Sequence, residues 1–242
     1  MRVYLSYVIG RLSRLFPKTT MIKKGILSGR FFVPFYSHYV SDDLRDLHAG
    51  RREPKLYQWL AELPDSAVYF DIGTSYGQEV TLASSLIEKN IAVVGFDCAL
   101  FTSHFCALNK KLNGDRFRFV FAAVGKRSGD LITITSNSDT HIPALHKKNV
   151  PYSYDVPTIA LDDFCRDNHI QPTHIKIDVD GAEAAVLAGA KSVLSGDVLQ
   201  GIFIERDHEF AELEALIESH GFVPVWRHDK AMNSEIIYEK QP

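Results

Sequence analysis

One segment, residues 67–77, constrains the fold of this 242-residue chain more than any other. It reads A-V-Y-F-D-I-G-T-S-Y-G: an apolar run that ends in an acid and passes into a loop with two glycines. Apolar residues then recur at helical spacing, namely Val80, Ala83 and Ile87. Glycine accepts backbone angles that other residues resist, and a helix that follows points unpaired N–H groups at the loop. The pattern therefore predicts a strand, a tight turn and a helix whose corner holds a nucleoside or a carboxylate; an ordinary turn of an α/β domain is the alternative.

Predicted strands and helices alternate along the rest of the chain. The predicted strands cover residues 67–71, 91–97, 117–122, 130–135, 173–179, 198–205, 222–227 and 235–239. The predicted helices cover residues 77–89, 99–112, 161–168, 182–191 and 208–219. Such alternation indicates an α/β fold with a mostly parallel sheet, and the last two strands read as an antiparallel hairpin. Residues 136–157, rich in Ser, Asn, His and Pro, are predicted to be a loop that closes over a site, with a disordered insertion as the alternative.

Composition narrows the class of function. A net charge of −3 and a pI near 6.4 give no case for a general nucleic-acid binder. The three cysteines (Cys98, Cys106 and Cys165) lack C-x-x-C spacing, so they indicate neither a disulfide framework nor a structural zinc site. These features favour a reducing cytoplasm. No apolar run approaches the ~20 residues that cross a bilayer.

The first 60 residues are predicted to be a basic helical arm, separate from a domain over residues 61–242. Every charged residue before Asp42 is basic. Apolar residues recur there at three- and four-residue spacing: Leu5, Val8, Ile9, Leu12, Leu15 and Phe16. Such an amphipathic helix packs on the rest of the chain or on a second subunit, the interpretation that we favour, or makes peripheral membrane contact through residues 1–30. Arg11 and Arg14 interrupt the apolar stretch, which argues against a signal peptide.

Four of the predicted core strands end in an acid: Asp71, Asp97, Asp178 and Glu205. The carboxyl ends of parallel strands meet at one edge of a sheet, where open α/β folds bind their ligands. Like charges gathered at one edge are costly unless they bind hydroxyls, a cation or N–H groups. The sequence therefore predicts a ligand site at this edge.

Asp97 lies about twenty residues after the glycine loop, where an acid usually accepts hydrogen bonds from ribose hydroxyls. A helix N-cap is the alternative role. The loop is G-x-x-x-G and lacks the middle glycine that lets a backbone close on a pyrophosphate. This favours S-adenosylmethionine over a nicotinamide dinucleotide. A nicotinamide oxidoreductase, which would also need a Tyr-x-x-x-Lys pair that is not evident here, remains a third alternative.

A second motif, H-I-K-I-D-V-D-G-A-E at residues 174–183, places Lys176 and Asp178 on one face of a strand. A lysine inside a central strand needs an acidic partner, and the pair is either a structural ion pair or part of a catalytic site. Glu183 begins the apolar face of the next helix and is predicted to point inward. His208, close after Glu205, is either a general base or a surface histidine.

Several motifs in a fixed order resemble the FkbM family of S-adenosylmethionine-dependent methyltransferases between Val68 and Trp226. They are D-I-G-T-S-Y-G at 71–77, G-F-D at 95–97, Asn109, F-A-A-V-G at 121–125, T-I-A-L-D-D at 158–163, I-K-I-D-V-D-G-A-E at 175–183, L-A-G-A at 187–190, I-E at 204–205 and H-G-F at 220–222. The resemblance implies a Rossmann-like class I methyltransferase fold with a seven-stranded, mostly parallel sheet and a C-terminal antiparallel hairpin. It also implies O-methylation of a hydroxyl on a sugar, glycolipid or natural product.

By position, the resemblance assigns cofactor-binding roles to loop residues at the methionine end, to a ribose-binding acid and to two residues beside the adenine. These residues are Asp71, Gly73, Thr74, Ser75, Tyr76 and Gly77 in the loop, then Asp97, then Ala122 and Ala123. The chain departs from the family's usual G-A-N at Gly73-Thr74-Ser75 and from the usual Glu-Pro at Asp97-Cys98, and Asp180 stands where glutamate is more usual.

An alcohol that accepts a methyl group must lose its proton as the bond forms, so the site needs a base. We predict that Asp178, paired with Lys176, or His208 is that base and that Glu205 orients a small-molecule or saccharide acceptor. A divalent metal held by Asp178, Asp180 and Glu205 is the less favoured variant. From another class, the chain is a non-catalytic binding or scaffold protein that retains the fold. We expect no nucleic-acid partner and leave a homo-oligomer and membrane association open.

Overall fold

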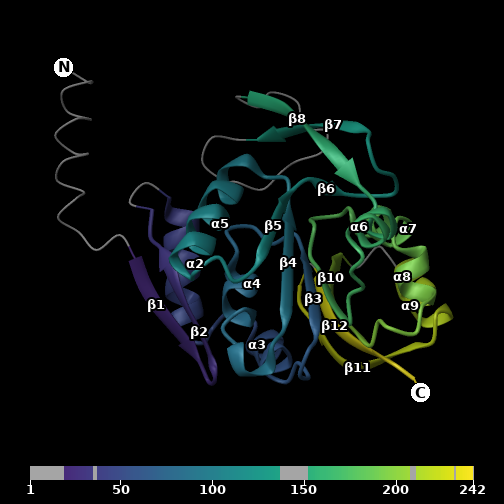
Figure 1. Ribbon diagram of the computed structural model, residues 1–242, viewed down its shortest axis with the longest axis horizontal. Helices are drawn as coiled ribbons and strands as arrows, with labels where there is room; N and C mark the ends of the chain where they lie inside the picture. The colour runs from purple at the N-terminus through teal and green to yellow at the C-terminus, as the bar shows by residue number, and fades with distance from the viewer. Residues whose placement is uncertain (1–18, 35–36, 137–151, 208–210, 232, 242) are drawn as a thin grey trace.

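A seven-stranded sheet forms the centre of the computed structural model, which describes residues 19–34, 37–136, 152–207, 211–231 and 233–241 (Figure 1). In sheet order the strands are β11 (Phe222–Asp229), β12 (Asn233–Lys240), β10 (Gly201–Asp207), β9 (His174–Ile177), β3 (Val68–Ile72), β4 (Ala92–Asp97) and β5 (Arg118–Phe121). β12 is antiparallel to both of its neighbours, and the other neighbouring strands are parallel. The predicted α/β fold, with its mostly parallel sheet and C-terminal hairpin, is confirmed.

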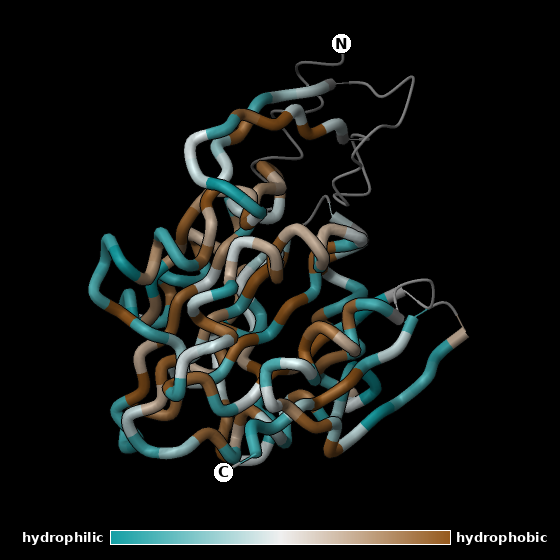
Figure 2. The backbone as a smooth tube through the Cα atoms, turned by 90° about the vertical axis from the view of Figure 1, so that its right-hand side faces the viewer, coloured by the Kyte–Doolittle hydropathy of each residue, from teal (hydrophilic) through white to brown (hydrophobic). Residues whose placement is uncertain are grey.

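Both faces of the sheet are covered by helices because successive side chains of a strand point to opposite faces and most of those in the central strands are apolar. Tyr69 and Val93 pack on the side of α3 (Pro54–Ala61), α4 (Gln78–Ala83) and α5 (Leu100–Leu112). Phe70 and Val94 pack on the opposite side, with α6 (Leu161–Asn168), α7 (Glu183–Ala188), α8 (Lys191–Ser195) and α9 (Ala211–Ser219). Figure 2 shows brown, hydrophobic segments through the middle of the molecule and teal, hydrophilic ones in the outer loops. The sheet is therefore buried on both faces.

A β-hairpin and a helix precede α3 and pack on the outside of its helix layer. The hairpin joins β1 (Thr19–Lys24) to β2 (Leu27–Phe32), and α2 (His38–His48) follows. Strand β2 lies against α4 and α5, and Ile22, Leu27 and Phe31 are buried in the same hydrophobic core as Tyr69. The predicted helical character of residues 1–60 is therefore wrong for residues 19–32. The apolar stretch from Leu5 to Phe16 lies outside the described residues, and a domain boundary at residue 60 stays a prediction.

A three-stranded sheet lies above the carboxyl end of β4 (Figure 1). It consists of β6 (Ala123–Val124), β8 (Tyr152–Ile159) and β7 (Leu131–Ser136), with β8 in the middle. The predicted loop over residues 136–157 is wrong from residue 152 onward, because Tyr154 and Val156 pack on the small core that contains Ile134. Residues 137–151 lie outside the described part of the chain.

Two predicted helices are shorter than the sequence indicated. The helix predicted over residues 77–89 ends at Ala83, and a 3₁₀ turn, η2, covers Ile87–Lys89. The helix predicted over residues 182–191 is divided into α7 and α8. No helix among the described residues is long and apolar enough to cross a membrane.

Candidate functional site

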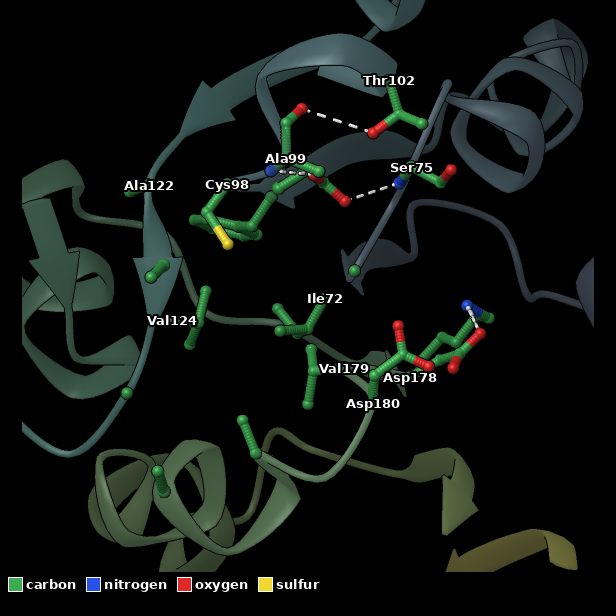
Figure 3. A pocket seen from close by; sticks show the side chains of 18 of the residues that line it. Ile72, Ser75, Cys98, Ala99, Thr102, Ala122, Val124, Asp178, Val179 and Asp180 are labelled. Carbon is green, nitrogen blue, oxygen red and sulfur yellow. Dashed lines mark hydrogen bonds and ion pairs between the residues drawn. The ribbon is translucent and has the colours of Figure 1, made fainter. Parts of the chain in front are cut away.

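A cavity of about 810 Å³ lies at the carboxyl ends of β3, β4 and β9 and extends to Glu205 of β10. Sheet order reverses between β3 and β9, the position at which open α/β sheets bind ligands. The volume falls in the range of small-molecule sites. Figure 3 shows Ala122 and Val124 on one side of the cavity and Asp178 and Asp180 on the other. The predicted position of the ligand site is consistent with this cavity.

The glycine loop packs tightly against the end of β9. Gly73 has φ +89°, and a Cβ atom there would lie 1.8 Å from the carbonyl oxygen of Asp178. Gly77 has φ +82°, and its Cβ would lie 2.8 Å from Sγ of Cys106. The N–H groups of Gly73 and Thr74 each donate to the Phe96 carbonyl over 2.9 Å. Both glycines are therefore required by left-handed backbone angles and close approaches.

Asp97 fixes the other side of this loop. Its Oδ2 accepts a hydrogen bond from the Ser75 N–H at 2.8 Å, and its Oδ1 accepts one from the Ala99 N–H at 2.6 Å. Burial raises the pKa of Asp97 to about 6, although these two N–H donors oppose the rise. A carboxylate has about four acceptor sites, so Asp97 retains capacity for ligand hydroxyls on the cavity wall.

An apolar slot lies next to Asp97. Ala122, Ala123 and Val124 line it from the chain that leaves β5, and Ile132 and Ile134 line it from β7. The hydroxyl of Tyr154 accepts a hydrogen bond from Leu100 N–H at 2.9 Å and donates one to the Cys98 carbonyl at 3.2 Å, which ties β8 to the loop after β4. These apolar side chains offer contact to an aromatic ring, and Asp97 beside them offers acceptors to hydroxyl groups. The residues present therefore suit a nucleoside.

Five of the nine predicted cofactor residues line the cavity, and the other four support the loop. The lining residues are Gly73, Ser75, Asp97, Ala122 and Ala123.

Asp71, Thr74, Tyr76 and Gly77 are not among the lining residues. Thr74 Oγ1 donates to Asp71 Oδ2 at 2.7 Å, and the Tyr76 hydroxyl donates to Asp43 Oδ2 at 2.5 Å. Burial raises the pKa of Asp71, and the nearby ammonium of Lys176 opposes this rise. These residues therefore stabilise the loop without lining the cavity.

Lys176 and Asp178 form the predicted ion pair inside the cavity wall. The Lys176 ammonium lies 3.0 Å from Oδ2 of Asp178 and 3.6 Å from Oδ1 of Asp71, and the lysine is buried. Burial alone would raise the pKa of Asp178, but the Lys176 ammonium outweighs burial and lowers it. Asp178 is therefore held as a carboxylate, with a quarter of its side chain exposed.

Two further acids share this end of the cavity. Glu205 accepts hydrogen bonds from Lys230 Nζ, at 3.1 Å, and from Asn233 Nδ2. Burial, with repulsion from Asp178, raises the pKa of Glu205. Burial and the same repulsion raise the pKa of Asp180 to about 6. The other candidate base, His208, lies outside the described residues.

Several residues that line this end of the cavity carry no sequence pattern that predicts a site. Tyr39 comes from α2, and Arg52 and Glu53 come from the turn before α3. Their segment was assigned to the arm, so no pattern in the sequence linked them to the site. Burial raises the pKa of Glu53 to about 7, although the Arg52 guanidinium opposes the rise.

Glu79, in the first turn of α4, was missed as well. It is buried, and its Oε1 accepts a hydrogen bond from the Tyr57 hydroxyl at 2.9 Å. Burial raises the pKa of Glu79 to about 7, against the lowering effect of the Lys176 ammonium. Its place opposite a lysine of the central strand could not be read from local spacing.

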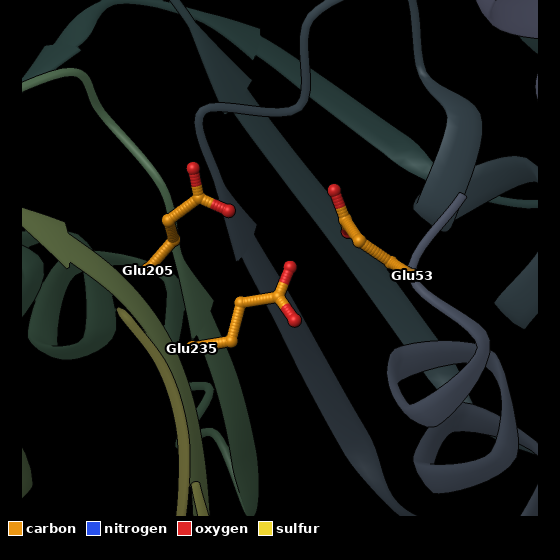
Figure 4. A group of neighbouring side chains, drawn as sticks. All are labelled: Glu53, Glu205 and Glu235. Atoms are coloured by element: carbon orange, nitrogen blue, oxygen red, sulfur yellow. The ribbon is translucent and has the colours of Figure 1, made fainter. Parts of the chain in front are cut away.

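One group of three carboxylates among the described residues has the spacing of metal ligands. Glu53 faces Glu205 and Glu235, with one ligand atom from each residue within 4.8 Å of the others (Figure 4). Of the predicted metal ligands Asp178, Asp180 and Glu205, this group contains Glu205 alone.

The comparisons with known proteins agree with this architecture. The family model described as "Methyltransferase FkbM domain" matches residues 70–224. Fibrillarin from Aeropyrum pernix, crystallised with natively bound S-adenosyl-L-methionine, superimposes with a TM-score of 0.50 at 9% identity, covering 76% of this chain and 73% of that one.

Two other solved structures are similar with lower scores. M. capricolum TrmK in complex with S-adenosyl-homocysteine has a TM-score of 0.47 at 13% identity, over 77% of this chain and 68% of that one. Precorrin-6y C5,15-methyltransferase from Geobacter metallireducens has 0.47 at 14% identity, over 78% and 87%. No curated protein matches the chain.

Proposed function

The chain belongs to the FkbM methyltransferase family, and we propose that it transfers a methyl group from S-adenosylmethionine to a hydroxyl of a sugar, glycolipid or natural product. S-adenosylmethionine would supply a methyl group on a sulfonium: a C–O bond to the acceptor would form as the S–CH₃ bond breaks, with S-adenosylhomocysteine as the leaving group. The observation that carries the proposal is that one cavity is lined by Asp97 with apolar residues at one end and by the carboxylates of Asp178, Asp180 and Glu205 at the other.

The nucleoside half of the cavity accounts for cofactor binding. Asp97 accepts hydrogen bonds from the ribose hydroxyls while the Ser75 and Ala99 N–H groups hold its carboxylate in place. Ala122 and Ala123 border the adenine. The polar wall from Gly73 to Asp178 and Asp180 faces the methionine end and its positive charge.

The other half provides the base. Asp178 is kept deprotonated by Lys176, so it can accept the proton of an acceptor hydroxyl. Glu205, held by Lys230, orients that hydroxyl. Because the wall offers both carboxylate acceptors and the donors Arg52 and Lys230, it suits an acceptor with several hydroxyls, such as a saccharide.

The proposal is tested by transfer of tritiated methyl groups from S-adenosylmethionine to a panel of probes. The panel contains methyl glycosides of rhamnose, fucose and galactose, catechol as a hydroxyl without a sugar, and total tRNA. We expect transfer to a glycoside. Transfer to tRNA alone would overturn the acceptor class.

Asp178→Asn tests the base. We expect its rate to fall by roughly 10²–10⁴-fold, the usual contribution of a positioned base, with S-adenosylhomocysteine bound as tightly as by the wild type. Full turnover by the variant would remove Asp178 from the role. Cofactor binding with no transfer to any probe would favour the alternative of a non-catalytic binding protein.

Cytoplasmic location, homo-oligomer formation and membrane contact through residues 1–30 stay predictions. Within the described part of that segment, Met21 and Ile26 are exposed on the same hairpin as Lys23 and Lys24. This combination suits contact with an anionic membrane surface.

A further inference from the structure

Three carboxylates from separate parts of the chain converge between the acceptor end of the cavity and a second, smaller hollow. We call Glu53, Glu205 and Glu235 the carboxylate cluster; they come from the turn before α3, from β10 and from β12. Figure 4 shows Glu53 pointing across a gap toward the other two. Hard divalent cations commonly bind carboxylate groups with this spacing. The cluster is therefore built like a metal site.

A lysine ammonium already bridges two members of the carboxylate cluster. Lys230 lies in the turn between β11 and β12, and its Nζ is 3.1 Å from Oε2 of Glu205 and in ion-pair contact with Oε1 of Glu235. The turn is closed by a hydrogen bond from Lys230 N–H to the Asn233 carbonyl at 2.8 Å. The backbone thus fixes the base of the lysine side chain close to the cluster.

The third carboxylate is paired with a guanidinium. Arg52 Nη2 lies 3.5 Å from Oε1 of Glu53, and Arg52 Nη1 also pairs with Asp43. The other oxygen of Glu53, Oε2, is buried and has no hydrogen-bond partner among the described residues. Glu53 itself has the left-handed φ of +36°, a conformation that is unfavourable for a residue other than glycine. The surroundings therefore impose the position of this carboxylate against a backbone preference.

We propose that Lys230 and Arg52 together take the place of a divalent metal ion in the carboxylate cluster. Their two positive charges equal the charge of one such ion. Lys230 contacts Glu205 and Glu235, and Arg52, which also pairs with Asp43, contacts Glu53. Lys230 is then a positioning residue, which holds Glu205 at the acceptor end without a metal. Both cations lie outside residues 70–224, the part that matches the family model, so this feature belongs to the flanking segments of this chain.

This inference rests on the proposed function only for the role of Glu205 toward the acceptor. The substitution of two cations for a metal rests on the ion pairs themselves. A hydrated ion has a route to the cluster, because a second hollow of about 300 Å³ borders it and is lined by Arg52, Glu53, Lys230 and Glu235 among other residues. Removal of one cation should therefore leave an accessible site that lacks half of its positive charge.

The test is calorimetric titration of the full chain with MnCl₂ alone at pH 8, above the pKa of about 7 of Glu53. We expect no Mn²⁺ binding by the wild type. Lys230→Gln should bind one Mn²⁺ per chain with a dissociation constant on the order of 10⁻⁴–10⁻³ M, by analogy with the weakest oxygen-ligand sites for Ca²⁺. Adding Glu235→Gln to this variant should abolish the gained binding, because one carboxylate of the cluster is lost.

Two controls separate this effect from a general change of charge. Lys230→Arg keeps the positive charge and should gain no metal binding. Lys110→Gln removes a lysine that pairs with Asp115 elsewhere on the surface, and it should gain none either. Arg52→Gln provides a second route to the gained site if Lys230→Gln does not fold.

Either of two results would overturn the inference. Wild-type binding of Mn²⁺ that Glu205→Gln abolishes would make the carboxylate cluster a metal site in its own right. Folded Lys230→Gln and Arg52→Gln that gain no Mn²⁺ would show that the cations do not replace a metal. Titration of the same variants with S-adenosylhomocysteine reports on the proposed function separately, since a variant can gain Mn²⁺ whether or not the cofactor binds.

Discussion

The shape of the glycine loop depends on the absence of a Cβ atom at Gly73. Gly73→Ala would place a Cβ atom 1.8 Å from a backbone oxygen that belongs to a central strand, in a left-handed conformation. Neither the oxygen nor the loop can move without displacing the end of β9. We expect Gly73→Ala to lower the free energy of unfolding by about 3 kcal/mol or more.

Urea denaturation compares the free energy of unfolding of Gly73→Ala with that of the control variant Gly125→Ala. Gly125 lines the same cavity, but no atom lies within 4 Å of its hypothetical Cβ and its φ is not left-handed. We expect the control to change stability by no more than about 0.5 kcal/mol, as open positions do. Equal stability of the two variants would contradict the close approach at Gly73.

The raised pKa of Glu79 predicts that the stability of the fold depends on pH. Its pKa is about 7 in the folded protein, mainly because of burial, and 4.5 is the ordinary value. Between these two pH values the folded state keeps a proton that the unfolded state has lost. Stability from this group is therefore present below about pH 4.5 and is lost as pH rises toward 7.

The Glu79→Gln variant isolates this contribution, because glutamine can still accept a hydrogen bond from Tyr57 and does not titrate. As pH rises from 5 to 8, the free energy of unfolding of the variant should increase relative to the wild type by roughly 1–3 kcal/mol, at about 1.4 kcal/mol per pKa unit. Guanidinium denaturation at the two pH values measures the difference. A difference that stays constant, or moves in favour of the wild type, would refute the raised pKa.

At the scale of elements, the β1–β2 hairpin shows that the segment before the family match is part of the fold. Phe31 of β2 is fully buried, and its ring meets the Tyr76 ring edge-on at a centroid distance of 6.3 Å. Tyr76 is part of the glycine loop. The hairpin is therefore packed against the element that shapes the cofactor half of the cavity.

Phe31→Ala should cost about 3–5 kcal/mol of stability, the usual range for a buried phenylalanine. Met21→Ala on the neighbouring strand is the control, because Met21 is 47% exposed and should cost no more than about 0.5 kcal/mol. Thermal or denaturant unfolding compares the two. A small loss in Phe31→Ala would mean that the hairpin contributes little to the stability of the domain.

Elements in the middle of the chain could be predicted because their signals are local. The strands at Asp71, Asp97 and Glu205 carry apolar runs with an acid near the end, and each is confirmed. β8 was missed because serine and proline in Tyr152–Ile159 are typical of loops, while its pairing with β7 depends on residues about twenty positions away. β1 (T-T-M-I-K-K) and β2 (L-S-G-R-F-F) were missed because neither shows a regular alternation of apolar and polar residues. The helical spacing between Leu5 and Phe16 was therefore extended over the whole basic segment.

At the scale of the whole molecule, the sequence indicated the residues at the Asp97 end of the cavity better than those at the Glu205 end. Asp97, Ser75 and Ala122 lie within about fifty residues of one another and follow a recurrent pattern, so spacing was sufficient to bring them to one cavity wall. Arg52, Glu53 and Lys230 reach the cavity from the two ends of the chain. Only tertiary packing brings these residues together, so no local periodicity in the sequence predicts that they are close.

We propose above all that the fold places Asp97 where it binds the ribose of S-adenosylmethionine. Calorimetric titration of the full chain with S-adenosylhomocysteine, for the wild type, Asp97→Ala and the surface control Asp115→Ala, tests it most directly. We predict binding by the wild type and the control. Asp97→Ala should bind at least about tenfold more weakly, the equivalent of about 1.4 kcal/mol for lost charged hydrogen bonds. Absence of binding by the wild type, or equal binding by a folded Asp97→Ala, would contradict the account.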